Sequence, residues 1–355
     1  LLNHKIINMK TNLFRFFAAL MLFFAAQKSN AYDFAASNSN GVTIYYNITS
    51  STTCEVTYQG SDYTSSVKYI GDISIPSIVY YNGMTYSVTG IGERAFYDCS
   101  GLTSISLPSS ITSIGENAFE GCSGLTSINL PSNITSIGSF AFGRCSGITS
   151  IVLPNISIII VNGSLYGCSG LTSVNLPNNI TTIPQGVFYD CINLLSIVLP
   201  NSVTSIGEGT FMDCKKLVSI NIPDGLNRIG NSAFLNCVSL PSISLPNSVT
   251  SIGYKAFTGC SGLQEFSCLN TTPPIVDETY DQVTVPSCKL IVPTESVAAY
   301  KKAYYWKEFT NIVGNTDTDT TEPENPDTPT PDTPTTPDTP TPDNYLAIAN
   351  MMVKA

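Results

Sequence analysis

The chain has 355 residues, of which 43% are hydrophobic and 12% are charged, so it can bury a large core and wholesale disorder is excluded. Its formal net charge is -10, but eight carboxylates and no lysine or arginine lie within residues 317–343, which leaves the rest of the chain nearly neutral. A nearly neutral body without a basic stripe excludes nucleic acid as a partner, because nucleic-acid affinity comes from neutralising many phosphates.

Residues 1–31 have the pattern of a secretory signal peptide. A start at Met9 and a short basic region precede an apolar stretch over residues 16–26, and Ser29 and Ala31 place small residues where signal peptidase reads. The apolar stretch is shorter than the about 20 residues that a membrane span needs. We therefore expect cleavage after Ala31 and a mature chain that is secreted or held on the outer cell surface, without a membrane-spanning segment.

The chain has one histidine, His4, which precedes the expected start. A mature chain without histidine lacks the usual activating base of serine and cysteine nucleophiles and the commonest zinc ligand. We therefore predict that the protein is not an enzyme, that it holds no metal, and that it needs no cofactor.

Residues 32–90 are expected to form an N-terminal cap. Residues 42–46 alternate as a strand does, residues 73–79 resemble part of a repeat, and Asn82 with Gly83 predicts a hairpin turn. Such a cap protects the first edge of whatever sheet follows it.

Eight cysteines follow one another at intervals of 23 positions, which identifies a repeat array. They are Cys99, Cys122, Cys145, Cys168, Cys191, Cys214, Cys237 and Cys260. A representative unit, residues 114–136, reads IGENAFEGCSGLTSINLPSNITS, and eight such units fill residues 91–274. A unit this short buries its apolar side chains only against the same side chains of its neighbours, so the pattern predicts a solenoid.

Each unit is expected to contribute one strand to a parallel β-sheet. Ile128, Asn129 and Leu130 alternate inward and outward, and Pro131 ends the ladder pairing. The segment that precedes Cys122 is too short and too rich in glycine for a full helix, so we predict a short helical, 3-10 or irregular outer turn.

The recurring IGxxAFxxCxxLxxIxLPxxVTS motif resembles the BspA-like leucine-rich repeat surface protein family of Bacteroidetes, also found in some parasitic protists. The resemblance implies a leucine-rich repeat right-handed solenoid, capped at both ends, in a surface protein that acts in adhesion. The unit from Ile160 departs from the motif, with Leu165 in the phenylalanine position. In the last unit Cys268 replaces a leucine that faces the core.

Residues 275–314 resemble the C-terminal cap of the same family, with a helix near Thr294 and Trp306 packed beside Phe309 and Ile312. Residues 315–343 are rich in proline, threonine and aspartate, which predicts an extended linker. Residues 344–355 are interpreted as the start of a further, truncated domain.

The repeated cysteines are predicted to form a ladder of buried free thiols. Stacked residues of adjacent turns lie about 4.8 Å apart, whereas the Cβ atoms of a relaxed disulfide lie about 3.8 Å apart. Cross-linking along the ladder is therefore disfavoured, although Cys268 and Cys288 could pair in the C-terminal cap.

The outward positions of the strands form columns of uncharged polar side chains, which could hydrogen-bond a glycan or an extended peptide. They are Ser104, Ser106, Ser127, Asn129, Ser150, Ser173, Asn175, Ser196, Ser219, Asn221 and Ser244, interrupted by Val152 and Val198. The alternative is a merely solvated sheet face.

Three functional classes follow from these observations. The first is a binding or adhesion module for a host or bacterial surface protein or a glycan, and the second is a passive spacer on the cell surface. The third, a hydrolase, needs two convergent carboxylates, whereas acids such as Glu116, Asp190 and Glu208 are scattered.

Overall fold

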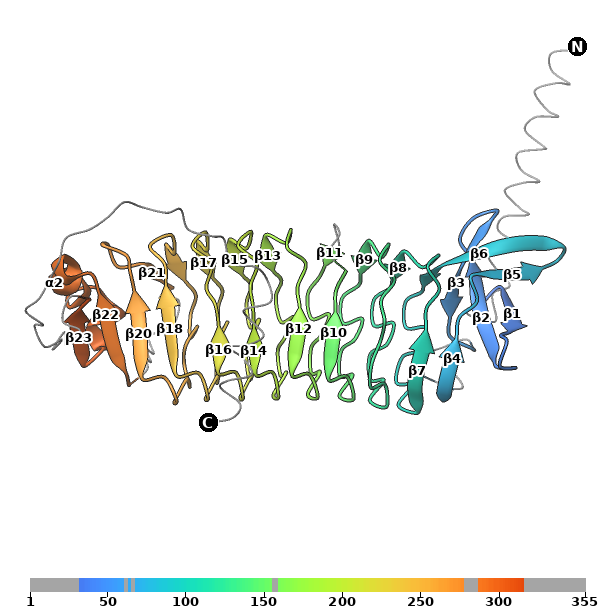
Figure 1. The fold of residues 1–355 in the computed structure, drawn as a ribbon, viewed down its shortest axis with the longest axis horizontal. Helices are drawn as coiled ribbons and strands as arrows, with labels where there is room; N and C mark the ends of the chain where they lie inside the picture. The colour runs from blue at the N-terminus through green and yellow to red at the C-terminus, as the bar shows by residue number, and fades with distance from the viewer. Residues whose placement is uncertain (1–31, 61–62, 65–67, 155–158, 278–286, 316–355) are drawn as a thin grey trace, which may run out of the picture. The chain divides into compact units, whose positions relative to one another are not determined.

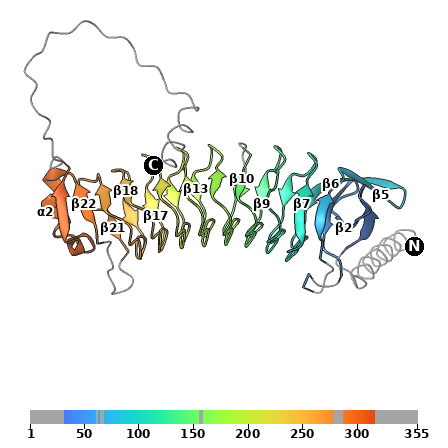
Figure 2. The same ribbon diagram turned by 60° about the horizontal axis from the view of Figure 1, so that its bottom comes forward.

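The computed structural model describes residues 32–60, 63–64, 68–154, 159–277 and 287–315. The chain divides into two compact units, 1–317 and 318–355, and every described residue belongs to the first. The expected signal peptide, the linker from residue 316 and the further domain lie outside the described residues. The described part is a solenoid of successive turns, as predicted (Figures 1 and 2).

Two ladders of short parallel strands run along the solenoid, and each is broken into separate hydrogen-bonded groups. The first ladder contains β4 (Gly71–Ser74), β7 (Leu102–Ser106), β10 (Ser150–Val152), β12 (Ser173–Asn175), β14 (Ser196–Ile197), β16 (Ser219–Ile220), β18 (Ser242–Leu245), β20 (Glu265–Cys268), β22 (Lys289–Val292) and β23 (Asn311–Gly314). The second contains β8 (Ser113–Ile114), β9 (Ser136–Ile137), β11 (Ile159–Ile160), β13 (Thr182–Ile183), β15 (Ser205–Ile206), β17 (Arg228–Ile229), β19 (Ser251–Ile252) and β21 (Ile275–Val276).

The expectation of one strand per turn was therefore wrong, because most turns contribute to both ladders. Most strands of the second ladder have only two residues, which is too short to show the alternation of apolar and polar side chains that identifies a strand in a sequence. The spacing did set the register: Ser150 pairs with Ser173, and Ser196 pairs with Ser219. Equivalent positions of neighbouring turns consequently stack on one another.

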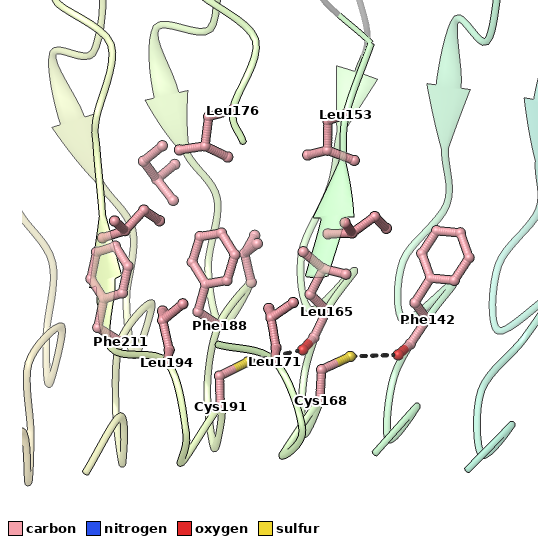
Figure 3. Packing of buried hydrophobic residues seen from close by; sticks show 14 of the residues in the cluster. Phe142, Leu153, Leu165, Cys168, Leu171, Leu176, Phe188, Cys191, Leu194 and Phe211 are labelled. Atoms are coloured by element: carbon pink, nitrogen blue, oxygen red, sulfur yellow. Dashed lines mark hydrogen bonds between the residues drawn. The ribbon is translucent and has the colours of Figure 1, made fainter. Parts of the chain in front are cut away.

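A column of phenylalanine rings fills the centre of the solenoid. Phe96, Phe119 and Phe142 stack with centroids 5.1 and 5.4 Å apart and planes within 5°. A second run joins Phe188, Phe211, Phe234 and Phe257 at 5.3 to 5.5 Å. Leu165 separates the two runs, as Figure 3 shows, and is itself buried. Stacked rings of this kind combine a large buried apolar area with favourable ring geometry.

The outer turns are neither α-helical nor 3-10 helical but irregular, and their backbone hydrogen bonds alternate. The N–H groups of Asn117, Phe119 and Gly121 donate to carbonyls of the next turn at 2.8 to 2.9 Å. The intervening Glu120 and Cys122 donate within their own turn, three residues back, at 3.1 Å. The alternation requires a left-handed backbone at two positions per turn, here Asn117 (φ 52) and Gly121 (φ 78).

The repeated cysteines have a specific hydrogen-bonding role. Each thiol from Cys122 to Cys260 donates to the carbonyl in the phenylalanine position of the preceding turn, at 3.0 to 3.3 Å. Figure 3 shows two of these bonds, from Cys168 to Phe142 and from Cys191 to Leu165. All eleven cysteines are free thiols, including Cys268 and Cys288.

The N-terminal end of the solenoid is covered by a small, mostly antiparallel sheet. It contains β1 (Phe34–Ser37), β2 (Thr43–Ile48), β3 (Thr53–Thr57), β5 (Ile78–Tyr81) and β6 (Met84–Ile91). The hairpin between β5 and β6 turns at Asn82 (φ 50) and Gly83 (φ 77), the left-handed pair that a tight hairpin needs. β6 then pairs in parallel with β8 and so begins the second ladder.

The other end is covered by short helical turns and β23. They are the 3-10 turns η1 (Thr294–Ser296) and η2 (Trp306–Glu308) and the helix α2 (Val297–Tyr300). Trp306 is 1% exposed, donates from Nε1 to the Pro274 carbonyl at 2.9 Å, and stacks on Phe309. The prediction that Trp306 belongs to the core is confirmed.

Candidate binding face

The candidate residues lie on the outward side of the first ladder, which we call the strand face. All eleven are exposed: Ser104, Ser106, Ser127, Asn129, Ser150, Ser173, Asn175, Ser196, Ser219, Asn221 and Ser244. They point outward because the alternate residues, such as Ile128 and Ile151, are buried in the core. The register between turns brings them together as columns that run along the solenoid.

Two of the eleven side chains are already engaged by the protein itself. Ser104 donates from Oγ to Asp72 Oδ1 at 2.6 Å. Asn221 accepts from the Leu199 N–H at 2.6 Å and donates to the Leu199 carbonyl at 2.9 Å, so its amide continues the ladder between two turns. The other nine side chains make no hydrogen bond within the described residues, and they are available to a ligand.

The strand face is hollowed at one of the places where pairing in the first ladder is interrupted, between β7 and β10. Residues 126–130 form no strand, and within the described chain their backbone makes no hydrogen bond to either neighbouring turn. A hollow of about 360 Å³ lies there, lined by Ser127, Ile128, Asn129, Leu130, Ser132, Ser150, Val152 and Pro154. Free backbone groups, serine and asparagine side chains and an apolar surface therefore meet at one place.

Exposed aliphatic side chains interrupt the polar columns. Val152 is 64% exposed and Val198 is 74% exposed. Leu195 and Val218 are 46% and 49% exposed, and they occupy the position that is threonine in earlier turns, such as Thr172. The sequence analysis missed this second pair, although alignment of the 23-residue units would have found it. The face is thus less uniformly polar than predicted.

Charged side chains lie at the two ends of the strand face. At the first end Asp72 accepts hydrogen bonds from Ser104 and Thr103, which lower the pKa of its carboxyl group. At the other end Lys289 Nζ lies 3.9 Å from Glu265 Oε1. The columns between these ends carry no charge, so the central face offers hydrogen bonds and apolar contacts and no ion pairs.

The buried thiols are not suited to nucleophilic chemistry. Burial raises the pKa of Cys168 to about 12 and that of Cys191 well above its ordinary value. A reactive cysteine has a lowered pKa, because the thiolate is the nucleophile. Within the described ranges, histidine, cysteine, aspartate and glutamate form no group that could hold a metal ion, and no helix is long and apolar enough to cross a membrane.

A second hollow, of about 420 Å³, lies where the last repeat meets the C-terminal cap. Asn247, Thr250, Leu269, Asn270, Thr271, Thr272, Pro273, Pro274 and Ile275 line it. The Asn270 side-chain amide nitrogen donates to the carbonyls of Asn247 and Val249, each at 2.9 Å. Its N–H donors are therefore already used in joining two turns. This hollow is separate from the strand face.

Comparison with known proteins places this geometry among leucine-rich repeats. The family model described as the BspA type leucine rich repeat region matches residues 89–203 and 181–309, in six copies. A leucine-rich repeat protein from Bacteroides ovatus is 27% identical with a TM-score of 0.58, over 80% of this chain and 76% of that one. No curated protein matches.

Two further solved structures align less closely. The T. pallidum leucine rich repeat protein is 29% identical with a TM-score of 0.46, over 59% of this chain and 88% of that one. A protein described as a leucine rich cell surface protein from Faecalibacterium prausnitzii is 20% identical with a TM-score of 0.33, over 80% of this chain and 95% of that one.

Proposed function

This chain belongs to the BspA type leucine rich repeat family, and from that membership we propose that it is a secreted or cell-surface binding module. In this proposal the signal peptide is cleaved after Ala31, and the strand face attaches to a surface protein or glycan of a host or of another bacterium. The protein acts by binding and not by catalysis.

One observation carries the proposal. Nine exposed serine and asparagine side chains repeat at the spacing of the turns without a hydrogen-bond partner in the described part of the chain, and three of them line the hollow of about 360 Å³. A rigid row of equivalent polar groups suits an extended ligand, because each turn adds a similar contact at no further cost in ordering.

The test replaces Ser127, Asn129, Ser173 and Asn175 together by lysine. These side chains are exposed, so the variant should fold, while four long cations should block the hydrogen-bonding row. We expect the parent to retain a ligand from a panel of matrix proteins and glycans, and the variant to lose it. Because the central face is uncharged, binding by the parent should survive moderate salt.

The matched control adds four lysines at exposed positions that directly precede strands of the second ladder, namely Thr112, Thr181, Thr204 and Asn227. It should bind as the parent does, which separates a local effect from the change in net charge. A folded quadruple variant that binds as well as the parent would place the site elsewhere. A parent that retains nothing from the panel would favour the passive spacer.

A further inference from the structure

A second surface runs along the outer turns, separate from the strand face. We call it the outer ridge, and it consists of the residue that directly follows the phenylalanine position in each turn. The ridge residues are Tyr97, Glu120, Gly143, Tyr166, Tyr189, Met212, Leu235 and Thr258. The next residue of each turn flanks the ridge, and it is Asp98, Gly121, Arg144, Gly167, Asp190, Asp213, Asn236 or Gly259.

In the N-terminal half, the ridge is covered by the protein's own cations. Arg144 Nη2 lies 3.0 Å from Glu120 Oε1, 3.5 Å from the Tyr97 hydroxyl and 3.8 Å from Asp98 Oδ1. The Lys68 ammonium lies 5.6 Å from the centre of the Tyr97 ring. The combination of tyrosine and carboxylate on this ridge therefore binds guanidinium and ammonium groups, since it does so within the same chain.

The next turns continue this combination of groups. The rings of Tyr166 and Tyr189 are 5.1 Å apart, and the Phe140 ring lies 6.0 Å from that of Tyr166. Burial raises the pKa of Tyr189, and Tyr166, Asp213 and Asp190 raise it further, because negative groups close by oppose ionisation of the hydroxyl. Two tyrosine rings and two carboxylates are thus gathered over consecutive turns, and Met212 and Leu235 extend the apolar side of the ridge.

Few cations of the protein reach these groups. Within the described residues, no lysine or arginine lies over the ring of Tyr166 or Tyr189, and Asp190 has no ion pair. Asp213 accepts a hydrogen bond from Asn236 Nδ2 at 3.2 Å and lies 3.9 Å from Lys215 Nζ; the aspartate side chain is 19% exposed and the lysine side chain is 56% exposed. This half of the ridge therefore has tyrosine and carboxylate groups like those of the first half, and Lys215 is the one cation paired with them in the described part of the chain.

The backbone beside these rings is open to an approaching chain. A Cβ atom added at Gly186 would contact only the Cβ of Tyr189, at 4.0 Å. A Cβ atom added at Gly209 would contact only the Cβ of Met212, also at 4.0 Å. One turn earlier the space is closed, because a Cβ at Gly163 would clash with the Phe140 ring. The open strip therefore begins after Phe140 and follows the two tyrosines.

We propose that this part of the outer ridge, the outer-turn residues 166–167, 186–190 and 209–213, is a docking site for a basic, extended segment of a partner protein. Arginine or lysine side chains of the partner lie over Tyr166 and Tyr189 and pair with Asp190 and Asp213. The glycine strip admits the partner's backbone. Cation–π contact and ion pairing act together in such a site, as they do around Arg144. The proposal uses a different surface from the strand face and does not rest on it.

The test uses the full chain and a fluorescein-labelled peptide of four Arg-Gly units, with the same peptide carrying citrulline as the neutral counterpart. We expect fluorescence anisotropy to show tighter binding of the arginine peptide. The double variant Asp190→Asn with Asp213→Asn should bind it about tenfold more weakly, because both ion pairs are lost. Asparagine suits the left-handed backbone at these positions, as Asn236 (φ 61) already shows in the next turn.

Two further sets of variants test whether the loss of binding comes from the change in net charge, and whether the aromatic ring of Tyr189 contributes to binding. The variant Asp224→Asn with Glu295→Gln removes the same charge at exposed positions away from the ridge and should bind as the parent does. Tyr189→Phe keeps the ring and should bind nearly normally, whereas Tyr189→Leu should bind several-fold more weakly.

The acidic segment 317–343 also attracts a basic peptide, so the site of contact must be mapped. A photoreactive benzophenone group on the arginine peptide should cross-link to the outer-turn residues 166–167, 186–190 and 209–213, and not to the strand-face residues between them, as read by mass spectrometry. Cross-links confined to 317–343, equal binding of the citrulline peptide, or undiminished binding by the Asp190 and Asp213 variant would each overturn the proposal. The strand-face lysine variant should still bind the peptide, so the two proposals can fail separately.

Discussion

Two residues in each outer turn carry the conformational constraint of the repeat. They adopt positive φ, and glycine fills many of these positions, but Arg94 (φ 54), Phe140 (φ 54) and Lys255 (φ 55) do so as well. A left-handed backbone costs free energy in a residue that has a Cβ atom, because the Cβ crowds the carbonyl oxygen, and it costs glycine little. Neighbouring turns impose the conformation through the inter-turn hydrogen bonds, so the residue type at these positions adjusts stability without changing the fold.

Gly209 isolates this backbone effect. Its φ is 57, and a Cβ there would meet only Met212 Cβ at 4.0 Å, so no steric clash contributes. We expect Gly209→Ala to lower the free energy of unfolding by about 1 to 2 kcal/mol, and Gly209→Asn to cost less. Chemical denaturation measures both. Gly225→Ala, where the backbone is not left-handed, is the control and should not destabilise; an equal loss there would contradict the explanation.

The buried thiols predict how stability depends on pH. The pKa of Cys168 is about 12 in the folded chain against an ordinary value of 9.0, so the folded state keeps its proton where the unfolded state loses it. Its contribution is complete below pH 9 and is lost as the pH rises from 9 towards 12, at about 1.4 kcal/mol per pH unit.

Urea denaturation between pH 7 and 11 measures this dependence. The parent should be insensitive to pH up to about 8 and lose stability above 9. Cys168→Ala should be less stable at pH 7, because it lacks the hydrogen bond to the Phe142 carbonyl, and its decline with pH should be shallower. A parallel decline in both proteins would show that Cys168 is not one of the groups responsible.

At the scale of the elements, the ends of the solenoid differ from its turns. Phe266 of the last repeat contacts Phe257 of the same repeat and Trp306 and Phe309 of the cap, at ring centroid distances of 4.9 to 5.8 Å. Tyr300 donates to the Asn270 carbonyl at 3.0 Å and joins α2 to the turn beneath it. The cap thus continues the aromatic core beyond the phenylalanine column.

Replacement of Trp306 by alanine tests whether this cap holds the adjacent turns. The change removes a fully buried ring and the hydrogen bond to Pro274, and about 3 to 5 kcal/mol of stability should be lost. Because each turn contacts only its neighbours, residues 252–277 should lose amide protection first while turns near residue 119 keep theirs. Hydrogen exchange read by mass spectrometry distinguishes this from a uniform loss of protection, which would contradict local capping.

The sequence predicted the elements that repeat and missed those that do not. The cysteine interval fixed the length of each turn, and the alternation around Ile128 predicted which side chains are buried and which form the strand face. The interruption at residues 126–130 was not predictable, because its sequence is close to that of the regular turns and the break depends on packing between neighbours. The outer ridge was missed because its residues change from turn to turn and match no motif.

At the scale of the whole molecule, the proposed export would determine where the two proposed binding surfaces act. We expect the mature protein to begin at Tyr32, because Ser29 and Ala31 are small residues that follow an apolar stretch. N-terminal sequencing of protein recovered from the producing cells measures this directly. A mature chain that retains residues 16–26 would contradict secretion by this route.

The hydrogen bonds between outer turns also have a mechanical consequence. They join each turn to the next, as from Phe119 to Ala141, so they run along the axis of the solenoid. A pull along that axis loads the contacts between turns in series, and the weakest junction yields first. Each released turn of 23 residues would pay out about 80 Å of chain. A chain pulled at its two ends would therefore extend in a series of short steps and not in a single break, since each released turn lowers the load on the junctions that remain.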